Sequence, residues 1–310
     1  MSKNKKQTVS SFFNLNKNQS ELEFLDVRLD TDVRLYIDPT SFSLLNNNWG
    51  IECTDLIRDY FQKVIDYIKQ GNKNKALELL SGLSEPNETH LGNSEGSSSG
   101  KGVGDNRADA LYNSLVTSKA ISSGLIMDLE ETAFLVDDIG PDMISDIVTN
   151  VIREKLIEYT QKMCKKYGIL TYLVNSGNIL NLNSGCWSTK KVLLPGAKSS
   201  NGRYEKLLLI PKDIVRRTPS YEAVKFNNDI IIPIIIDRDF RLGLGKVVNG
   251  TLKPYSKTTI KNRQKGQSIK SINRDFLMQN SGVLVEYRKN KKPLSRMSDT
   301  ELSKIIDDKQ

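Results

Sequence analysis

The sequence predicts an α+β protein, with a mostly helical N-terminal part followed by a mixed α/β C-terminal part that contains a largely antiparallel sheet. Two observations lead to this fold class. Apolar residues recur at helical spacing over much of residues 54–167, and beyond Tyr167 the chain changes to short β-type runs separated by Gly, Pro and Asn. The 310-residue length allows one large domain or two ordinary ones.

The first half begins with residues 1–20, which are polar and rich in Asn and Lys, and are predicted to form a disordered tail. "LEFLDVRL" and "VRLYIDP" alternate well enough to predict two short strands. "TDLIRDYFQKVIDYIKQG" predicts a helix with Thr54 as its N-cap and Gly71 as its end, and "NKNKALELLSGL" predicts a short second helix. Three further helical patterns cover residues 105–120, 127–137 and 141–167.

The second half is expected to supply the strands. The β-type runs are "GILTYLV", "KVLLP", "EKLLLIP", "DIIIPIIID", "KVVNGTLKP" and "GVLVEYRK", and helical patterns return at 268–280 and 298–308. We therefore expect a mainly helical acidic domain at 21–167, with a Gly/Ser loop at 92–104, and a basic α+β domain at 168–310.

The composition excludes several classes of site. His90 is the only histidine, so zincin motifs and multi-histidine metal centres are excluded, and a Ser/His/Asp triad would depend on that residue alone. Cys53, Cys164 and Cys186 are far apart and odd in number, which argues against a disulfide framework. No apolar run reaches the roughly 18 residues of a membrane span. We therefore expect a cytoplasmic protein with no membrane partner.

Charge is distributed unevenly along the chain. Residues 1–150 contain 14 Lys+Arg and 23 Asp+Glu, whereas residues 151–310 contain 31 Lys+Arg and 14 Asp+Glu. Such asymmetry indicates DNA or RNA as a partner of the basic half, although a solvated basic surface would have the same composition. The candidate nucleic-acid-binding residues are Lys101, Lys257, Lys261, Arg263, Lys265, Lys270 and Arg274.

The Gly/Ser loop is not a Walker A loop. Gly96-Ser-Ser-Ser-Gly100-Lys101 has one residue too few between its glycines, and Gly102 replaces the hydroxyl residue that would bind Mg²⁺. A turn or a flexible segment that guides a phosphate, with Lys101 as a nearby cation, is the better interpretation.

Two short segments resemble the helix-hairpin-helix motif, whose pattern is G-hydrophobic-G followed by a helix. They are residues 102–111 (GVGDNRADAL) and, more weakly, residues 138–147 (DIGPDMISDI). The resemblance implies non-specific contact between helix N-termini and a nucleic-acid backbone. The second segment has Asp138 where Gly is expected and Ile144 where Ala is expected. A Gly-capped turn between packed helices is the alternative.

Carboxylates are the candidate catalytic groups. Asp142 and Asp146 lie at positions i and i+4, so they project from one helix face, and Asp138 precedes that helix by a turn. Glu85 and Glu88 lie beside the Gly/Ser loop. A few carboxylates with water and substrate phosphate are the ligands that Mg²⁺ or Mn²⁺ prefer. We predict Asp138, Asp142 and Asp146 as catalytic and Asp142, Asp146, Glu85 and Glu88 as metal ligands. Solvent-exposed acids at a helix start are the alternative.

A second candidate centre resembles, poorly, the PD-(D/E)xK nucleases, in which carboxylates on strands bind a metal. Asp237 ends the run "IIPIIID", and Glu286 precedes Arg288 by two residues. Strand-end caps are the alternative for both acids.

The function that uses both halves is a divalent-metal-dependent nuclease or phosphodiesterase. A role in bacterial antiviral defence is an additional hypothesis that no particular residue supports. The competing class is a non-catalytic nucleic-acid-binding or assembly subunit whose acidic half docks a partner protein. A third class is an effector that binds a nucleotide in the Gly/Ser loop without cleaving it.

Overall fold

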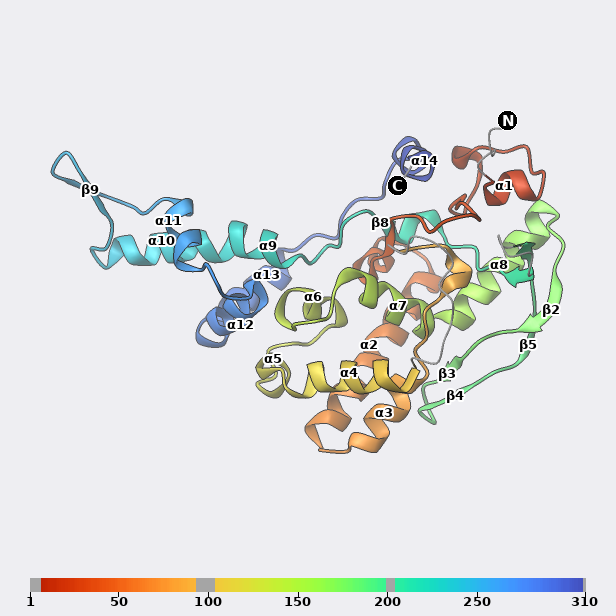
Figure 1. The fold of residues 1–310 in the computed structure, drawn as a ribbon, viewed down its shortest axis with the longest axis horizontal. Coiled ribbons are helices and arrows are strands. Elements are labelled where there is room, and N and C mark those ends of the chain that lie inside the picture. The colour runs from red at the N-terminus through yellow and green to blue at the C-terminus, as the bar shows by residue number, and fades with distance from the viewer. Residues whose placement is uncertain (1–6, 93–103, 199–203, 309–310) are drawn as a thin grey trace. The chain divides into compact units, whose positions relative to one another are not determined.

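The computed structural model describes residues 7–92, 104–198 and 204–308 (Figure 1). It is 54% helical and 12% strand, with small antiparallel sheets mostly in the C-terminal half, which confirms the α+β class. Contacts divide the chain into two compact units. Unit 1 consists of residues 1–112, 141–220 and 293–310, and unit 2 of residues 113–140 and 221–292. Each unit therefore draws on segments from both sides of residue 167.

Residues 7–20 are ordered, so the predicted disordered tail is wrong for this part of the chain. Helix α1 (Val9–Phe12) is capped by Thr8, and the Val9 side chain is fully buried. The Ser10 backbone N and Oγ donate to the Asp26 carboxylate at 2.6 and 2.5 Å. The polar composition predicted disorder because it does not reveal that one valine and one buried carboxylate can anchor such a segment.

The two strands predicted between residues 22 and 39 are mostly not strands. Only β1 (Tyr36–Ile37) forms, and it pairs antiparallel with β8 (Val215–Arg216). Elsewhere in this segment single bridges join Phe24 to Pro211 and Val33 to Leu91. The alternating apolar residues are buried, so the pattern predicted burial correctly but not sheet pairing.

The first long helix, α2 (Asn48–Lys69), begins before the predicted cap because the Asn47 side chain accepts from Gly50 N. Thr54, the predicted cap, lies inside the helix and donates its hydroxyl to the Gly50 carbonyl. Helix α3 (Lys73–Ser81) packs on α2, and the buried Tyr60 hydroxyl donates to the Leu79 carbonyl. Helix α4 (Gly104–Val116) runs from unit 1 into unit 2.

The pattern at 141–167 forms two helices rather than one. These are α7 (Pro141–Val151) and α8 (Arg153–Tyr167), with Ile152 leaving helical geometry at φ −94° and ψ 14°. The apolar stripe continues across the interruption, since Ile152 N still bonds to Val148 O and Leu156 N to Ile152 O. A continuous stripe therefore predicted a single helix.

Three two-stranded antiparallel sheets follow α8 in unit 1. They are β2 (Tyr172–Asn175) with β5 (Lys191–Leu194), β3 (Ile179–Asn181) with β4 (Cys186–Ser188), and β6 (Gly196–Lys198) with β7 (Tyr204–Lys206). The predicted strand run that continues to Ile210 is buried beyond Lys206 but is not paired in a sheet.

Unit 2 is mainly helical around an aromatic core. The Phe134 ring centroid lies 4.7 Å from Phe226 and 5.4 Å from Tyr221, and Phe226 lies 4.7 Å from Tyr287. Its helices are α5 (Lys119–Ser122), α6 (Thr132–Leu135), α9 (Ala223–Phe226), α10 (Ile232–Arg241), α11 (Lys257–Arg263), α12 (Ile269–Gln279) and α13 (Ser281–Asn290). The pattern at 127–137 forms only a 3₁₀ turn (Leu129–Glu131) and the short α6.

Two runs predicted as strands in unit 2 are helical. Residues Asn227–Ile231 form a π-helical turn that continues into α10, and "GVLVEYRK" lies in α13. The isoleucine run, which only Pro233 interrupts, has no period of two, so it does not distinguish a buried strand from a helix. Pro233 is the second residue of α10, so its missing N–H lies where the π-helical turn gives way to the α-helix.

One hairpin in unit 2 forms as the sequence predicts. Strand β9 (Lys246–Val248) pairs with β10 (Thr251–Lys253) through an Asn249-Gly250 turn. Both turn residues have positive φ, at 49° and 76°, as a type I′ turn requires. In Figure 1 this hairpin lies beyond the C-terminal end of α10, away from α12 and α13.

The last segment belongs to unit 1. Arg216 donates to the Leu294 carbonyl, and Lys212 pairs with Asp299 at 2.8 Å. Asp299 opens α14 (Asp299–Asp307), whose N-cap Ser298 forms a capping box with Glu301. In the described part of the chain, no helix combines the length and the apolar character needed to cross a membrane.

Candidate functional site

One face of α7 and the start of α8 carries a polar series in unit 1. Asp142, Asp146 and Asn150 follow one another at intervals of four residues, and Arg153 opens α8. Exposure falls along the series, from the exposed Asp142 to Asn150 and Arg153, which are 0% and 1% exposed. We call these four residues the polar face. The predicted spacing of Asp142 and Asp146 is thus realised in a helix.

Asp146 is held by an arginine that the sequence analysis did not identify. Arg107 Nη2 lies 2.5 Å from Asp146 Oδ2. Burial raises the pKa of Asp146 to about 7; the hydrogen bond and charge of Arg107 oppose the rise, and the charges of Asp142 and Glu85 add to it. A carboxyl group that titrates near neutrality can donate or accept a proton at physiological pH. The cavity beside this pair measures only about 10 Å³, which is room for about one water molecule.

Glu88 neutralises a buried arginine. It pairs with Arg153 Nη1, and Lys206 Nζ lies 4.0 Å from the same carboxylate. Arg153 Nη2 donates to Asn150 at 3.1 Å, while its buried Nε has no hydrogen-bond partner in the described part of the chain. Gly177 has φ +77°, a conformation that other residues rarely adopt, and a Cβ there would press on Arg153 Nη1 at 3.0 Å, so the position favours glycine.

The predicted metal ligands are only partly brought together. Asp142, Asp146 and Glu85 influence one another electrostatically, but Asp146 is engaged by Arg107 and Glu88 by Arg153. Within residues 7–92, 104–198 and 204–308, no three His, Cys, Asp or Glu side chains are arranged to hold a metal ion. A Mg²⁺ or Mn²⁺ site therefore stays a prediction.

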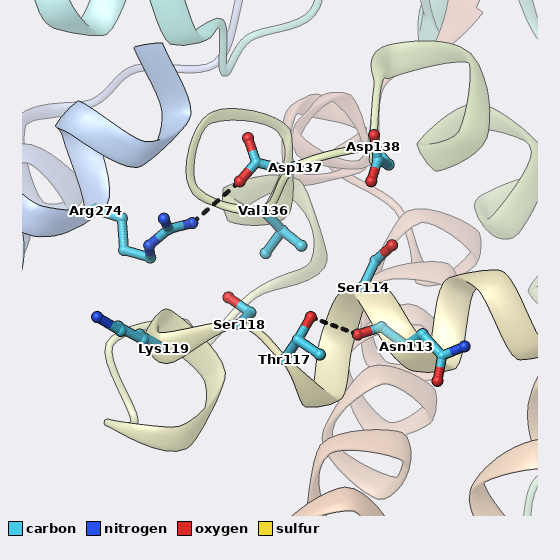
Figure 2. A pocket seen from close by; sticks show the side chains of 9 residues that line it. All are labelled: Asn113, Ser114, Thr117, Ser118, Lys119, Val136, Asp137, Asp138 and Arg274. Carbon is cyan, nitrogen blue, oxygen red and sulfur yellow. Dashed lines mark hydrogen bonds and ion pairs between the residues drawn. The ribbon is translucent and has the colours of Figure 1, made fainter. Parts of the chain in front are cut away.

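Asp138, the third predicted catalytic residue, lies in unit 2 and lines a different cavity. Its φ is +64°, the left-handed conformation usual for the glycine that the hairpin pattern has at this position. The cavity has a volume of about 340 Å³ (Figure 2). Its lining residues are Asn113, Ser114, Thr117, Ser118, Lys119, Val136, Asp137, Asp138 and Arg274.

Two predicted nucleic-acid-binding residues of α12 have structural partners in unit 2. Arg274 Nη1 lies 3.3 Å from Asp137 Oδ2, and Lys270 Nζ donates to the Val136 and Ile139 carbonyls at 2.8 and 2.6 Å. Burial lowers the pKa of Lys270, against the attraction of nearby carboxylates. Lys270 thus donates the hydrogen bonds that the carbonyl groups on either side of Asp138 require.

The predicted binding residues of α11 divide into two groups. Arg263 stacks on Tyr255, with 4.1 Å between Cζ and the ring centroid, and pairs with the buried Asp239 at 3.0 Å. Lys261 and Lys265 are exposed and make no ion pair within the described residues, and the exposed Lys257 donates only to the Asn228 carbonyl. Lys101 lies outside the described residues.

The hairpin adds two lysines that the sequence analysis did not select. Lys246 and Lys253 lie directly opposite each other in the β9–β10 register, and both are exposed. Like charges at such a position repel and destabilise a strand pair. Their pairing could have been read from the Asn-Gly turn, which fixes the register.

The second predicted nuclease centre is not formed, because both of its acids lie on helices. Asp237 pairs with Arg241 within α10 at 2.9 Å, and Glu286 accepts from Asn290 within α13. The strand-borne carboxylates that this pattern requires are therefore absent at these positions.

His90 is half-buried rather than fully exposed, with φ +53°, and its carbonyl accepts from Val33 N. Burial lowers its pKa, against the attraction of nearby acids led by Asp32.

Sequence comparison adds one finding. The family described as "Domain of unknown function (DUF8370)" matches residues 14–222, more than half of the chain. No curated protein and no solved structure matches. The basic segment 223–292 lies outside the matched residues.

Proposed function

Since the chain belongs to the DUF8370 family, whose description assigns no function, we propose one from geometry: unit 2 binds duplex DNA through its β9–β10 hairpin and α11. The observation that carries this proposal is the pair of opposed, exposed lysines Lys246 and Lys253. A polyanion would relieve their mutual repulsion. We place this activity in the cytoplasm.

Charge around the hairpin supports the proposal. Residues 240–265, which we call the basic arm, contain seven Lys+Arg and no Asp or Glu. Among these, Lys246, Lys253, Lys261 and Lys265 make no ion pair within the described residues. Such cations bind phosphates and release the counterions that surround nucleic acid.

The exposure of the hairpin also supports it. Val247 is 66% and Leu252 36% exposed, although they face each other across the strand pair. An isolated two-stranded hairpin is marginally stable in water, so a partner that covers it would stabilise it. A two-stranded ribbon fits the major groove of B-DNA, whereas the major groove of A-form RNA is too narrow and deep. This favours duplex DNA over duplex RNA.

The test is fluorescence anisotropy with DNA and RNA duplexes of one sequence between 50 and 200 mM KCl. We expect DNA to bind more tightly, and the Lys246→Gln/Lys253→Gln variant to reduce the slope of log K against log salt by about 1.8. Over this fourfold range the wild type should lose about 12-fold more affinity than the variant.

Lys162→Gln/Lys165→Gln, which alters two exposed lysines of α8, is the matched control and should retain the wild-type slope. Equal slopes for the hairpin variant and the wild type, or no binding of DNA, would contradict the proposal. Binding of a protein partner by the exposed apolar residues of the arm would then be the competing explanation.

A second candidate function is metal-dependent cleavage of phosphodiesters at the polar face of unit 1. The proximity of Asp142 and Glu85 to Asp146 favours it: burial is the main cause of the raised pKa of Asp146, the charges of these two acids add to the rise, and a divalent cation would relieve their repulsion. Unlike the basic arm, these residues lie within the matched family segment.

Cleavage is tested on single- and double-stranded DNA and RNA with Mg²⁺ or Mn²⁺, with EDTA as the metal-free control. Asp142→Ala/Asp146→Ala should abolish cutting, whereas Asp55→Ala/Asp59→Ala, a pair at the same spacing on α2 whose side chains are 50% and 57% exposed, should not. Cutting that survives in the first variant would exclude this site. Salt-sensitive binding without cutting would leave the DNA-binding function alone.

A further inference from the structure

The cavity of Figure 2 is a separate feature of unit 2. It lies between the end of α4, the start of α5, the turn at 136–138 and Arg274 of α12. Its volume of about 340 Å³ is within the range of small-molecule sites, roughly 300–1,000 Å³. It therefore has room for a compact ligand.

Two buried polar atoms of the lining residues have no hydrogen-bond partner in the described part of the chain. They are Ser118 Oγ, in a residue 5% exposed, and Arg274 Nε, which lies 3.8 Å from Asp275 Oδ1, beyond hydrogen-bond distance. A buried polar group left unpaired costs about 1–3 kcal/mol, so native proteins normally satisfy it. A polar ligand in the cavity would do so.

The charged groups around the cavity are only partly used by the protein. Arg274 shares its charge with Asp137 and, at 3.8 Å, with Asp275, whereas the side chains of Lys119 and Asp138 make no hydrogen bond or ion pair within the described residues. Figure 2 shows Arg274 and Lys119 on one side of the cavity and Asp138 on the other. A matching ligand has an anionic end and, opposite it, groups that donate hydrogen bonds.

Few apolar side chains line the cavity. Val136 is the one aliphatic residue among the lining residues, and no aromatic ring is among them. A nucleobase or an aromatic ligand would find no stacking partner here. Asn113, Ser114 and Thr117 add amide and hydroxyl groups to the wall, which suits a ligand that is rich in hydrogen-bonding groups.

We propose that this cavity binds a phosphorylated sugar. Lys119 and Arg274 contact the phosphate, the Ser118 hydroxyl donates to it, and the Asp138 carboxylate accepts from sugar hydroxyls. The site is independent of DNA binding by the hairpin, because it uses none of the basic-arm lysines.

Isothermal titration of the full chain with ribose 5-phosphate, ribose and inorganic phosphate tests the proposal. We expect ribose 5-phosphate to bind at least tenfold more tightly than either fragment, since it alone engages both sides of the cavity. Absence of binding up to millimolar concentration, or equal binding of inorganic phosphate, would overturn the assignment.

Three variants distinguish the contacts. Lys119→Glu should weaken ribose 5-phosphate about 10- to 100-fold, as expected for a hydrogen bond between charged groups. Ser118→Ala should weaken it less without destabilising the fold, because its hydroxyl has no protein partner to lose. Asp138→Asn should reduce the preference for ribose 5-phosphate over inorganic phosphate. Lys289→Glu, an exposed lysine of α13 in the same unit, is the control and should bind normally. Unchanged binding by Lys119→Glu would refute the proposed contacts.

The phosphorylated sugar could be free or could be the end of a nucleic-acid strand. Titration with a 5′-phosphorylated and a 5′-hydroxyl trinucleotide, in the Lys246→Gln/Lys253→Gln background, distinguishes these sources. Selective binding of the phosphorylated strand assigns the cavity to strand ends, and binding of ribose 5-phosphate alone assigns it to a free metabolite. Failure of both ligands in this background, with DNA binding by the wild type intact, would reject the cavity proposal and leave the hairpin proposal standing.

Discussion

Replacing Glu88 by glutamine distinguishes a metal ligand from the counterion of a buried arginine. Glu88 was predicted to bind Mg²⁺ or Mn²⁺, yet its side chain is only 11% exposed and pairs with the buried side chain of Arg153. Loss of its charge leaves Arg153 without an anion, and Lys206 loses its nearby carboxylate too. We therefore expect Glu88→Gln to destabilise unit 1 even when no metal is present.

The expected magnitude follows from the burial of the pair. Removing one partner of a buried ion pair costs about 3–5 kcal/mol, because the remaining charge is uncompensated. Glutamine retains one acceptor oxygen, so we expect a loss of about 2–4 kcal/mol for Glu88→Gln and more for Glu88→Ala. With a urea m value of about 1–3 kcal/mol/M, a loss of 3 kcal/mol lowers the unfolding midpoint by about 1–3 M.

Urea unfolding in EDTA, followed by circular dichroism, measures this shift. Glu52→Gln is the matched control, since Glu52 is 53% exposed and pairs with Lys155 on the surface, where such a pair is worth at most about 1 kcal/mol. The double variant Glu88→Leu/Arg153→Met should be more stable than Glu88→Leu alone. A midpoint for Glu88→Gln equal to that of the wild type, or no coupling in the double variant, would refute the counterion assignment.

Three further predictions concern single side chains. Asp146→Asn should remove a pH dependence of the free energy of unfolding. The pKa of Asp146 is raised from 3.8 to about 7 in the folded state, so its stabilising contribution is complete below pH 4 and is lost as pH rises to 7. The free energy of unfolding of the wild type, relative to that of Asp146→Asn, should therefore fall over this pH range by at most about 4 kcal/mol. Denaturant unfolding at pH 4–8 measures this; a difference between the two proteins that does not change with pH would disprove the raised pKa. Arg288→Met should lower the stability of unit 2 by about 3–5 kcal/mol, because Arg288 Nη2 lies 2.8 Å from the fully buried Glu131. Arg241→Met, which alters an exposed arginine paired with the exposed Asp237, is the control, and equal melting of the two variants would argue against this prediction. Asp138→Gly should raise the free energy of unfolding by about 0.5–1 kcal/mol, because glycine adopts the φ of +64° without strain. A lower melting temperature of this variant would show that the aspartate makes a compensating contact.

The parts of the fold that the sequence predicted correctly depend on local patterns. Helices α2, α7, α12 and α14 follow apolar periodicity, and the β9–β10 hairpin follows its Asn-Gly turn. The isoleucine run of α10 was misassigned because its period is uninformative without knowledge of what it packs on. The strand predicted over "VRLYIDP" was longer than β1, because alternation of apolar residues shows burial but not which residues pair in a sheet.

The candidate site could be predicted only as far as one helix face. Asp142 and Asp146 share that face as their spacing requires, but the partner of Asp146 is Arg107, 39 positions away in the sequence. Glu88 and Arg153 are separated by 65 positions. Pairings over such distances depend on how α4 and the 84–92 segment pack on α7 and α8, and no local pattern encodes that packing. The one local signal was Arg153, since an arginine among the buried apolar residues at the start of α8 requires an anionic partner.

The division of unit 1 into three separate stretches of chain has a consequence for synthesis on the ribosome. Its last stretch, 293–308, supplies Leu294 to Arg216 and Asp299 to Lys212, so these contacts form only after all of residues 221–292 have been translated. Unit 2 can therefore become compact while unit 1 is still incomplete. Until α14 emerges, nascent unit 1 lacks the contacts made by its C-terminal stretch, a state in which chaperone binding and proteolysis compete with completion of the fold.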